Sequence, residues 1–329
     1  MKEKVMPEKR VSVVMCTYNG GRFLKEQIDS ILGQDYPLYE IIIQDDGSTD
    51  STLAKLEEYR QQYPDLIHVF KNKTRLGFCR NFHQALLRAS GDFVAISDQD
   101  DIWFPQKIRR QVESIGDYDL CFSDYYTDAQ YHQPLTCRVR PRTDFEHLIF
   151  YDCTPGHAML LRNDFIKGIK EWDYLIYYDW WLSVHALMGR GITKVDEPLN
   201  WHRHHEASAT THIYKPGRWE AVPHPTWQPY VLGYWHRLHL LKKRNYRHFY
   251  TYLSEHIDCQ RYPVASRMAK LMLTRNPIGV LQLCLLCCIY YKRTYPGHPH
   301  GLSGRIHGFF YPFIAAYGND LFKLERDRN

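Results

Sequence analysis

Three carboxylates lie within four residues in the stretch "SDQDDIWFPQKI", directly after an apolar run. They are Asp98, Asp100 and Asp101. Carboxylate oxygens on a short loop suit Mg²⁺ or Mn²⁺, and such a cation would offset the repulsion between the acids. For an isolated D-x-D, an acidic turn that caps the following helix is the simpler explanation. We therefore take Asp98 and Asp100 as candidate metal ligands, and Asp101 as a candidate cap for a helix that begins at Pro105.

Two further polar clusters also follow apolar runs. Thr17-Tyr18-Asn19 follows "VSVVMC", and Asp45-Asp46-Gly47-Ser48 follows "EIIIQ". An aspartate can accept a hydrogen bond from a nucleobase or a ribose hydroxyl, and a tyrosine can stack on a base. Taken alone, each cluster is equally well explained as a turn with a helix cap.

The elements that would position these clusters alternate along the first hundred residues. Short apolar runs at 11–17, about 40–45, about 67–71 and 92–97 predict buried strands, and helical spacing predicts helices near 23–32, 51–62 and 78–89. This order predicts an α/β fold with a mostly parallel central sheet, right-handed crossovers and flanking helices. Ligands bind outside the carboxyl ends of such strands, where all three clusters lie.

The alternation weakens after residue 118. "YDLCFSDYY" predicts a strand, "GHAMLLRNDF" a strand that runs into a helix, and Trp180, Val184 and Leu187 mark an amphipathic helix. From about residue 215 the sequence becomes rich in Trp and Pro, then basic, then apolar. We therefore expect a catalytic domain over 1–214 and a mainly helical region over 215–329.

The net charge of +5 divides unevenly between these regions. Residues 1–214 hold 25 Lys and Arg against 31 Asp and Glu, a net −6, whereas 215–329 hold 17 against 6, a net +11. A basic region favours a polyanionic partner, either a membrane surface or nucleic acid. Zinc-finger, RNA-recognition and basic-zipper signatures are absent from the sequence, which argues against nucleic acid.

The run "PIGVLQLCLLCCIYY", 277–291, lies between Arg275 and Lys292-Arg293. Fifteen residues are too few to span a bilayer comfortably as a helix. A buried helix and an interfacial membrane anchor both remain open, and the basic flanks favour the anchor. Nine scattered cysteines favour a reducing compartment, and the N-terminal residues lack a signal-peptide pattern. We expect a cytoplasmic protein at the inner face of the membrane.

Taken in order, the motifs resemble the inverting family 2 glycosyltransferases with the GT-A fold, most closely the bacterial rhamnosyltransferase-like branch of surface-polysaccharide synthesis. The first four are "VSVVMCTYNGGRFLKEQIDSIL", "IIIQDDGSTDST", "GFCRNF" and "SDQDDIWFPQKI". "TPGHAMLLRNDF", "YYDWWLSVHALMGRGI" and "WHRHHEASA" follow in the order of that branch. The resemblance covers about residues 10–210.

The resemblance implies a role for each matching position. The donor nucleotide would be bound by Thr17, Tyr18, Asn19, Asp46 and Asp98. Asp98 and Asp100 would hold Mg²⁺ or Mn²⁺ against the donor diphosphate, and Asp179 would be the general base. The diphosphate and acceptor side would comprise Gly156, His157, Trp180, Arg203 and His205. The implied donor is a UDP-, dTDP- or GDP-sugar, and the acceptor a glycan on a polyprenyl diphosphate.

The chain departs from the branch at four positions. His202, His204 and Glu206 stand where the branch commonly has Tyr, Gln and Gly, and His157 stands where it often has Cys. Three histidines within four residues suggest a transition-metal site, but without partner ligands a phosphate-facing or solvated cluster is favoured.

Two other functions fit part of the pattern. A Mg²⁺-dependent sugar nucleotidyltransferase would release pyrophosphate and normally carries a glycine-rich phosphate loop, which "TYNGGR" matches only loosely. A non-catalytic receiver-like or sugar-binding module would explain the acids at the strand ends. That module would leave Asp179, Arg203 and His205 without a role.

Overall fold

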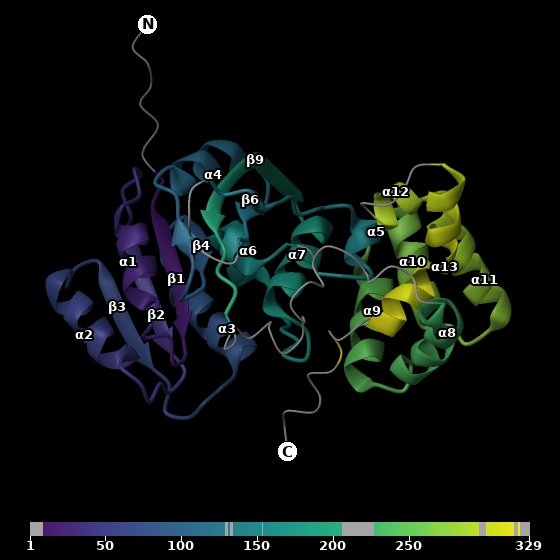
Figure 1. The fold of residues 1–329 in the computed structure, drawn as a ribbon, viewed down its shortest axis with the longest axis horizontal. Coiled ribbons are helices and arrows are strands. Elements are labelled where there is room, and N and C mark those ends of the chain that lie inside the picture. Colours follow the sequence, from purple (N-terminus) through teal and green to yellow (C-terminus); the bar gives the residue numbers. More distant parts are fainter. Residues whose placement is uncertain are drawn as a thin grey trace, which may run out of the picture. The chain divides into compact units, whose positions relative to one another are not determined.

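The computed structural model describes residues 9–128, 131, 134–152, 154–205, 227–295, 301–318 and 322. The chain divides into two compact units (Figure 1). The first comprises residues 1–141, 154–174 and 185–204, and the second 142–153, 175–184 and 205–329. Each unit has its own apolar core.

A nine-stranded mixed sheet forms the first unit. Its strands are β1 (Val11–Thr17), β2 (Glu40–Asp45), β3 (Ile67–Lys71), β4 (Phe93–Ser97), β5 (Ile102–Trp103), β6 (Leu120–Tyr126), β7 (Arg138–Val139), β8 (Met159–Arg162) and β9 (Ile192–Trp201). Their order is β3-β2-β1-β4-β8-β6-β9-β5, and β7 pairs with β6.

The first four strands are the parallel half of this sheet, as the sequence predicts. Every residue of β1, β2 and β4 is buried, because helices cover both faces. On one face Val11, Val13 and Met15 pack with Leu24 and Ile28 in a single core cluster. Each such side chain, when fully buried, contributes about 1.5 to 3 kcal/mol.

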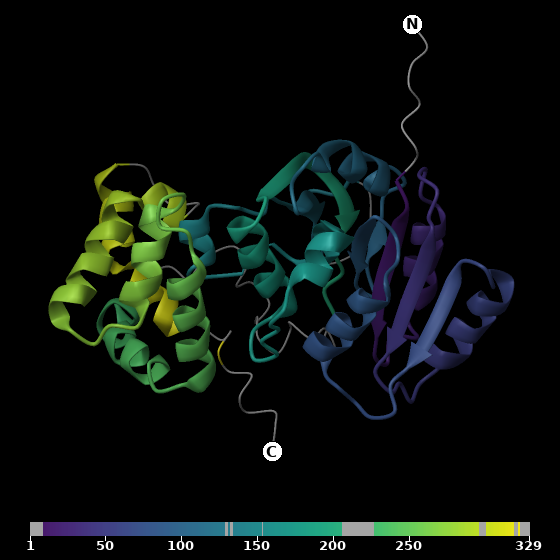
Figure 2. The same cartoon turned by 180° about the vertical axis from the view of Figure 1, so that it is seen from behind.

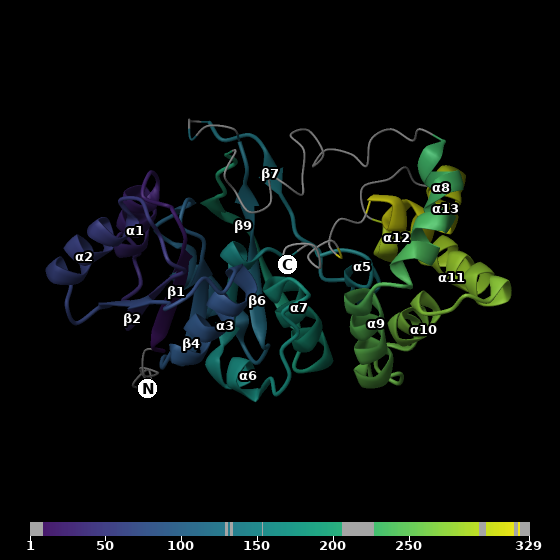
Figure 3. The ribbon, with the colours of Figure 1, turned by 90° about the horizontal axis from the view of Figure 1, so that it is seen from below.

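The helices of this unit lie on both faces of the sheet (Figures 2 and 3). They are α1 (Leu24–Leu32), α2 (Thr52–Gln62), α3 (Phe78–Arg88), α4 (Lys107–Ile115) and α6 (Asn163–Gly168), with a 3₁₀ turn at Gly156–Ala158. The predicted helices near 51–62 and 78–89 are confirmed. The helix expected to begin at Pro105 instead begins at Lys107, because a turn at 104–107 precedes it.

The second half of the sheet changes direction. β8 is antiparallel to β4 and β6, whereas β9 is parallel to β6 and bulged against it. The end of β9 then pairs antiparallel with β5, so that Ile102 lies opposite Trp201 and Trp103 opposite Asn200. This pairing brings the segment after β9 beside the segment after β4.

The second unit is helical. Its helices are α5 (Phe145–Leu148), α8 (Gln228–Leu240), α9 (Arg244–His256), α10 (Pro263–Met272), α11 (Pro277–Ile289), α12 (Tyr291–Thr294) and α13 (Leu302–Gly318), and it includes the first turns of α7 (Tyr178–Met188). Figure 3 shows α13 beside α8. Within the described residues, the helices are all too short or too polar to cross a membrane.

Candidate functional site

The carboxyl ends of β1, β2 and β4 lie in register at one edge of the sheet. Thr17 pairs with Asp45 across the β1–β2 ladder, and Met15 pairs with Ser97 across the β1–β4 ladder. The Thr17 hydroxyl donates to Asp45 Oδ2 at 2.9 Å, and Asp45 also accepts from the backbone N–H groups of Gly47 and Ser48. Asp45 is therefore the structural member of the Asp45-Asp46 pair, since it shapes the turn after β2.

Hydrogen bonds join the loop after β1 to its two neighbours. Asn19 accepts from the Thr49 N–H at 2.8 Å, and it adopts a left-handed φ of 49°. The Gln99 side chain accepts from the Tyr18 N–H at 2.9 Å and donates to the Tyr18 carbonyl at 3.2 Å. A Cβ at Gly20 would lie 2.1 Å from Gln99 Oε1, so a larger residue there would displace the Gln99 side chain from Tyr18.

Tyr18 and Asp46, both predicted to bind the nucleotide, contact the segment 72–77. The guanidinium of Arg75 lies 3.9 Å from the centre of the Tyr18 ring. The buried carboxylate of Asp46 accepts from the N–H groups of Leu76 at 2.7 Å and Gly77 at 2.9 Å. Arg75 is a candidate site residue that the sequence prediction missed, since only the folded loop brings it to Tyr18.

The predicted metal ligands follow β4. Asp98 is half-buried and Asp100 is buried, so both charges lie where water screens them poorly. Their field reaches a neighbouring imidazole, because both carboxylates raise the pKa of His202. Two hard oxygen donors in a negative potential fit Mg²⁺ or Mn²⁺. Asp98 and Asp100 would hold such an ion.

Asp101 has a different role from the predicted helix cap, and that prediction is wrong. Its Oδ1 accepts from His202 Nδ1 at 2.9 Å and from the Arg203 N–H at 3.1 Å. The β5–β9 pairing brings these groups together across about a hundred residues of sequence. Asp101 thus fixes the segment 202–205 to the loop after β4.

A stack of two imidazoles completes this cluster. His157 lies parallel to His202, with ring centres 4.3 Å apart, and its Nδ1 is 2.9 Å from the Asn200 side-chain nitrogen. Burial lowers the pKa of His157 well below its usual value, and the charge of His202 lowers it further. Burial also acts to lower the pKa of His202, but Asp101 overcomes this and raises it to about 9. His202 is therefore the charged ring and His157 the neutral one at pH 7.

Lys107 is a second basic residue that feels the charge of Asp101. Its side chain is fully buried, with the ammonium 5.0 Å from the centre of the Trp103 ring. Burial lowers the pKa of Lys107 to about 7, and the charge of Asp101 opposes that shift. Asp101 Oδ2 and Lys107 Nζ lack hydrogen-bond partners among the described residues. The charge of Asp101 thus acts on two basic side chains, His202 and Lys107, and raises the pKa of each.

Asp101, His157 and His202 offer ligand atoms within 4.8 Å of one another, close enough to hold a metal ion. The sequence alone showed no partner ligands for the histidines at 202–205. The structure places Asp101 and His157 close enough to His202 to serve as such ligands. In the structure, however, Asp101 is hydrogen-bonded to His202 and raises its pKa to about 9, so a metal ion would have to displace the proton of that imidazole. Parallel rings also direct their in-plane lone pairs side by side, without convergence on one ion. The structure as it stands favours a hydrogen-bonded network.

His202 should make the stability of this region depend on pH. Its pKa rises from 6.5 to about 9 on folding, so the stabilisation is complete below pH 6.5 and is lost as the pH rises through 9. The full loss is about 3 kcal/mol. We expect the unfolding free energy of His202→Gln to fall less than that of the wild type between pH 6.5 and 9. Urea unfolding at several pH values across this range measures the unfolding free energy of both proteins.

Lys107 has the opposite effect on the unfolding free energy. Because its pKa is lowered in the folded protein, its contribution to stability increases as the pH rises above 7. The contribution of His202 is therefore read from the difference between the two proteins. If the unfolding free energies of wild type and His202→Gln changed equally with pH, the Asp101–His202 pair would not contribute to the pH dependence of stability.

Arg203, predicted to face the diphosphate, is held on several sides. Its Nε donates to the Asp100 carbonyl at 2.7 Å, and its guanidinium also pairs with Glu26. The rings of Phe23 and Trp201 lie 4.3 and 4.7 Å from the guanidinium carbon. The structure therefore brings Arg203 directly beside the candidate metal ligand Asp100.

The remaining predicted residues divide between the units. Gly156 and His157 belong to the first, where both are buried, whereas Asp179, Trp180 and His205 belong to the second. Asp179 lies in the first turn of α7 and accepts from the Trp180 N–H at 3.0 Å. Negative charge is favoured at this helix end.

Trp180 and His157, both predicted to lie on the diphosphate and acceptor side, are buried in the structure. Trp180 is fully buried, donates to the Leu148 carbonyl at 2.7 Å and packs 4.4 Å from the Phe249 ring. It fixes the start of α7 and hence the position of Asp179. His205 is half-buried at the end of its described segment.

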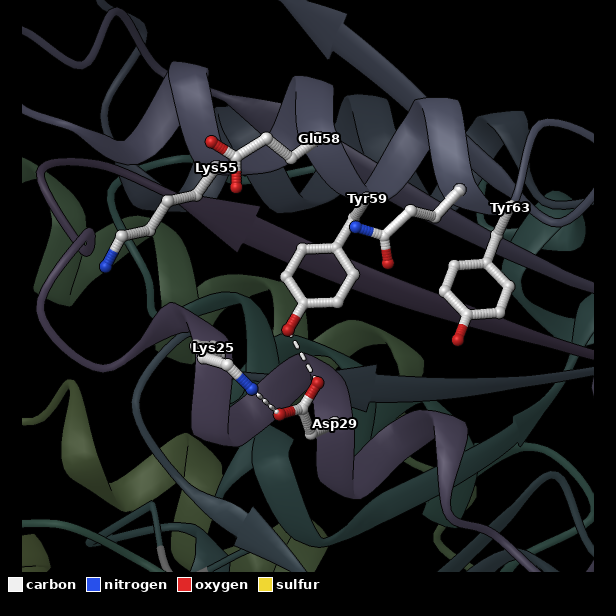
Figure 4. Close-up of a pocket in the computed structure, with 7 residues that line it drawn as sticks. Lys25, Asp29, Lys55, Glu58, Tyr59 and Tyr63 are labelled. Carbon is white, nitrogen blue, oxygen red and sulfur yellow. Dashed lines mark hydrogen bonds and ion pairs between the residues drawn. The ribbon is translucent and has the colours of Figure 1, made fainter.

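A pocket of about 220 Å³ lies between α1 and α2 (Figure 4). Four of its seven lining side chains are already paired: Asp29 accepts from Lys25 and Tyr59 at 2.5 Å each, and Lys55 donates to the Gly21 carbonyl at 2.6 Å. The strand-end residues do not line it. We therefore place the candidate site at the strand ends and not in this pocket.

Comparison with known proteins identifies the kind of domain that carries these strand ends. Residues 12–168 match the family model described as glycosyl transferase family 2. The putative glycosyltransferase EpsE of Bacillus subtilis is 42% identical over 103 residues, which cover 31% of this chain and 37% of EpsE. The dTDP-rhamnosyl transferase RfbG of Shigella flexneri is 27% identical over 210 residues, which cover 58% of this chain and 72% of RfbG.

Among solved structures, the mannosyltransferase PcManGT of Pyrobaculum calidifontis, in complex with GDP-Man and Mn²⁺, superposes with a TM-score of 0.52 at 17% identity. The match covers 98% of this chain and 88% of PcManGT. The chain therefore carries a glycosyltransferase family 2 domain, with the GT-A type of α/β fold followed by a helical C-terminal region. This confirms the resemblance at the level of domain and fold.

Proposed function

We propose that this protein is an inverting, metal-dependent glycosyltransferase that transfers a sugar from a nucleoside-diphosphate sugar to a lipid-linked glycan in surface-polysaccharide synthesis. One observation carries the proposal: Asp46, Asp98 and Asp100 gather with Arg203 at the carboxyl edge of a family 2 domain. The names of RfbG and PcManGT, which refer to dTDP-rhamnose and to GDP-Man with Mn²⁺, support a nucleotide-sugar donor.

The proposed reaction breaks the bond between the anomeric carbon and the diphosphate oxygen, and forms a bond to an acceptor hydroxyl oxygen. A single in-line displacement inverts the anomeric centre and needs one base, Asp179, to take the hydroxyl proton. The diphosphate leaves with increased negative charge. Asp98 and Asp100 would hold a divalent cation, which would supply Lewis-acid stabilisation of that charge.

The chain's own cations add to this stabilisation. The Arg203 guanidinium contacts the Asp100 backbone, and the proton on His202 lies in the field of Asp98 and Asp100. Positive groups fixed in advance near the leaving group lower the barrier without reorganisation. At the other end of the donor, Thr17, Tyr18, Asn19 and Asp46 would hold the nucleoside, with Arg75 as an added contact.

The two regions of the chain would have different roles. Residues 1–214 would carry the chemistry, and the basic region 215–329 would associate with the cytoplasmic face of the inner membrane. A polyprenyl diphosphate acceptor would be presented at that surface. The sugar is proposed to be rhamnose or another hexose.

A nucleotide-sugar panel tests this function. UDP-, dTDP- and GDP-sugars are incubated with the protein and Mg²⁺ or Mn²⁺, and release of nucleoside diphosphate is measured. We expect release from one nucleotide class and its loss on chelation of the metal. Release of pyrophosphate in a parallel incubation with nucleoside triphosphates and sugar 1-phosphates would indicate a nucleotidyltransferase, and failure to bind any nucleotide in a thermal-shift assay would indicate a binding module. Either result overturns the proposal.

A further inference from the structure

The helix α11 is apolar on every side, yet only one side of it is buried. Gln282 is its sole charged or amide side chain. Val280, Leu283, Cys284 and Cys287 face the interior of the helical unit, where α13 packs against α11. A helix that is apolar all round is ordinarily covered all round. The other side of α11 therefore calls for a covering partner.

That other side forms a continuous row, which we call the α11 stripe: Ile278, Leu281, Leu285 and Ile289. The spacing of three, four and four residues aligns them along the helix. Their exposed fractions are 66%, 50%, 46% and 62%. At 1.5 Å per residue the stripe is about 17 Å long. Four large aliphatic side chains in one row are more than the scattered exposure of single residues that is normal on a surface.

Positive charge surrounds the stripe and negative charge is absent from its neighbourhood in the sequence. Arg275 precedes it, Lys292 follows it, and Arg267 on α10 reaches Gln282 at 3.3 Å. Arg275 and Lys292 form no ion pair within the described residues. The sequence contains no Asp or Glu from 259 to 319. The neighbouring Arg293 differs, since it pairs with Glu146 at 3.2 Å.

The charge pattern decides between the two main candidate partners. In a symmetric pair of copies joined antiparallel through α11, Arg275 of one copy would approach Lys292 of the other. No acid of this segment could offset that repulsion. An anionic lipid surface offers acyl chains to the stripe and phosphates to the cations at both ends.

We propose that the α11 stripe docks on an anionic lipid bilayer, with α11 lying flat in the interface. The aliphatic side chains enter the boundary between headgroups and acyl chains, and Arg275 and Lys292 contact lipid phosphates. The inference rests on the proposed function, because the lipid-linked acceptor is the reason for the protein to bind a membrane. It names the surface and the lipid charge that this association uses.

The test is co-sedimentation of the full chain with vesicles. Phosphatidylglycerol–phosphatidylcholine vesicles are compared with vesicles of phosphatidylcholine alone, at low and high salt. We expect binding to the anionic vesicles, weakened by salt. We expect Leu281→Ser combined with Leu285→Ser to weaken that binding by at least about tenfold, because two aliphatic insertions are lost.

Matched controls come from elsewhere on the chain. Leu87 on α3 is 48% exposed, like Leu281 and Leu285, so Leu87→Ser should bind vesicles as the wild type does. Arg275→Gln with Lys292→Gln should reduce anionic binding, whereas the same change at the exposed Arg244 and Arg247 of α9 should have less effect. Circular dichroism confirms that each variant is folded.

Three results would overturn the inference. The wild type does not bind anionic vesicles, or the stripe variant binds as well as the wild type. Alternatively, light scattering shows a dimer that the stripe variant dissociates, which makes a second copy the partner. Nucleoside diphosphate release is measured without vesicles in parallel. A wild type that releases nucleoside diphosphate but does not bind anionic vesicles refutes the docking surface alone, whereas absent release in the wild type refutes the proposed function.

Discussion

Asp179→Asn is expected to lower turnover by about 10²- to 10⁴-fold while leaving donor binding unchanged, which is the range for loss of a general base. The amide is nearly the same size as the carboxylate and can still accept the Trp180 N–H that Asp179 now accepts. It cannot take a proton from an acceptor hydroxyl. The rate of nucleoside diphosphate release and the donor affinity, measured on the same preparation, separate the two effects.

The buried tryptophan beside Asp179 provides the control. Trp180→Phe removes the hydrogen bond to the Leu148 carbonyl but keeps the carboxylate, so it should lower stability first and turnover only as α7 shifts. Asp179→Asn should scarcely change the unfolding temperature, because only about 0.3 to 1 kcal/mol of helix-end electrostatics is lost. Near wild-type turnover in Asp179→Asn with intact donor binding would exclude Asp179 as the base.

The parallel half of the sheet could be predicted from the sequence because its signals are local. β1, β2 and β4 are short apolar runs, and each ends in polar turn formers that mark the chain reversal. Once the strands are known to be parallel, Thr17, Asp46 and Asp98 must lie at one edge.

The second half of the site could not be predicted in the same way. Asp101 and His202 are 101 residues apart, and their contact depends on the antiparallel register of β5 with the end of β9. β5 has two residues, too few for any periodicity. The likeness of "DQDD" to a helix-capping turn is real, but tertiary pairing gives the Asp101 carboxylate a stronger partner.

Burial also places some residues in environments that the sequence does not indicate. Lys107 reads as a surface charge in an amphipathic helix, yet it is fully buried beside Trp103. For α11 the sequence left a buried helix and an interfacial helix open, and the structure shows one buried side and one exposed side. Composition alone cannot divide so apolar a helix into faces, because a single polar residue, Gln282, does not define a boundary.

Asp100→Asn is expected to lower nucleoside diphosphate release by about 10³-fold and to abolish the stabilisation of donor binding by Mn²⁺, since the lost Lewis-acid contribution is several kcal/mol. The substitution removes one negative charge but keeps the backbone carbonyl that accepts from Arg203. Calorimetric titration of the nucleotide with and without Mn²⁺ measures the coupling. Equal coupling in the variant and the wild type would exclude Asp100 as a metal ligand.

The control for Asp100→Asn lies at the opposite end of the same strand. Asp92 precedes β4 and accepts from the Arg10 N–H at 2.9 Å, so Asp92→Asn changes the charge equally without touching the carboxyl edge. It should leave the Mn²⁺ dependence intact.

Asp100→Asn should also lower the pKa of His202, because Asp100 helps to raise it. A changed Mn²⁺ response together with a shifted His202 titration would locate the lost charge at the metal site, whereas a general loss of stability would produce neither change.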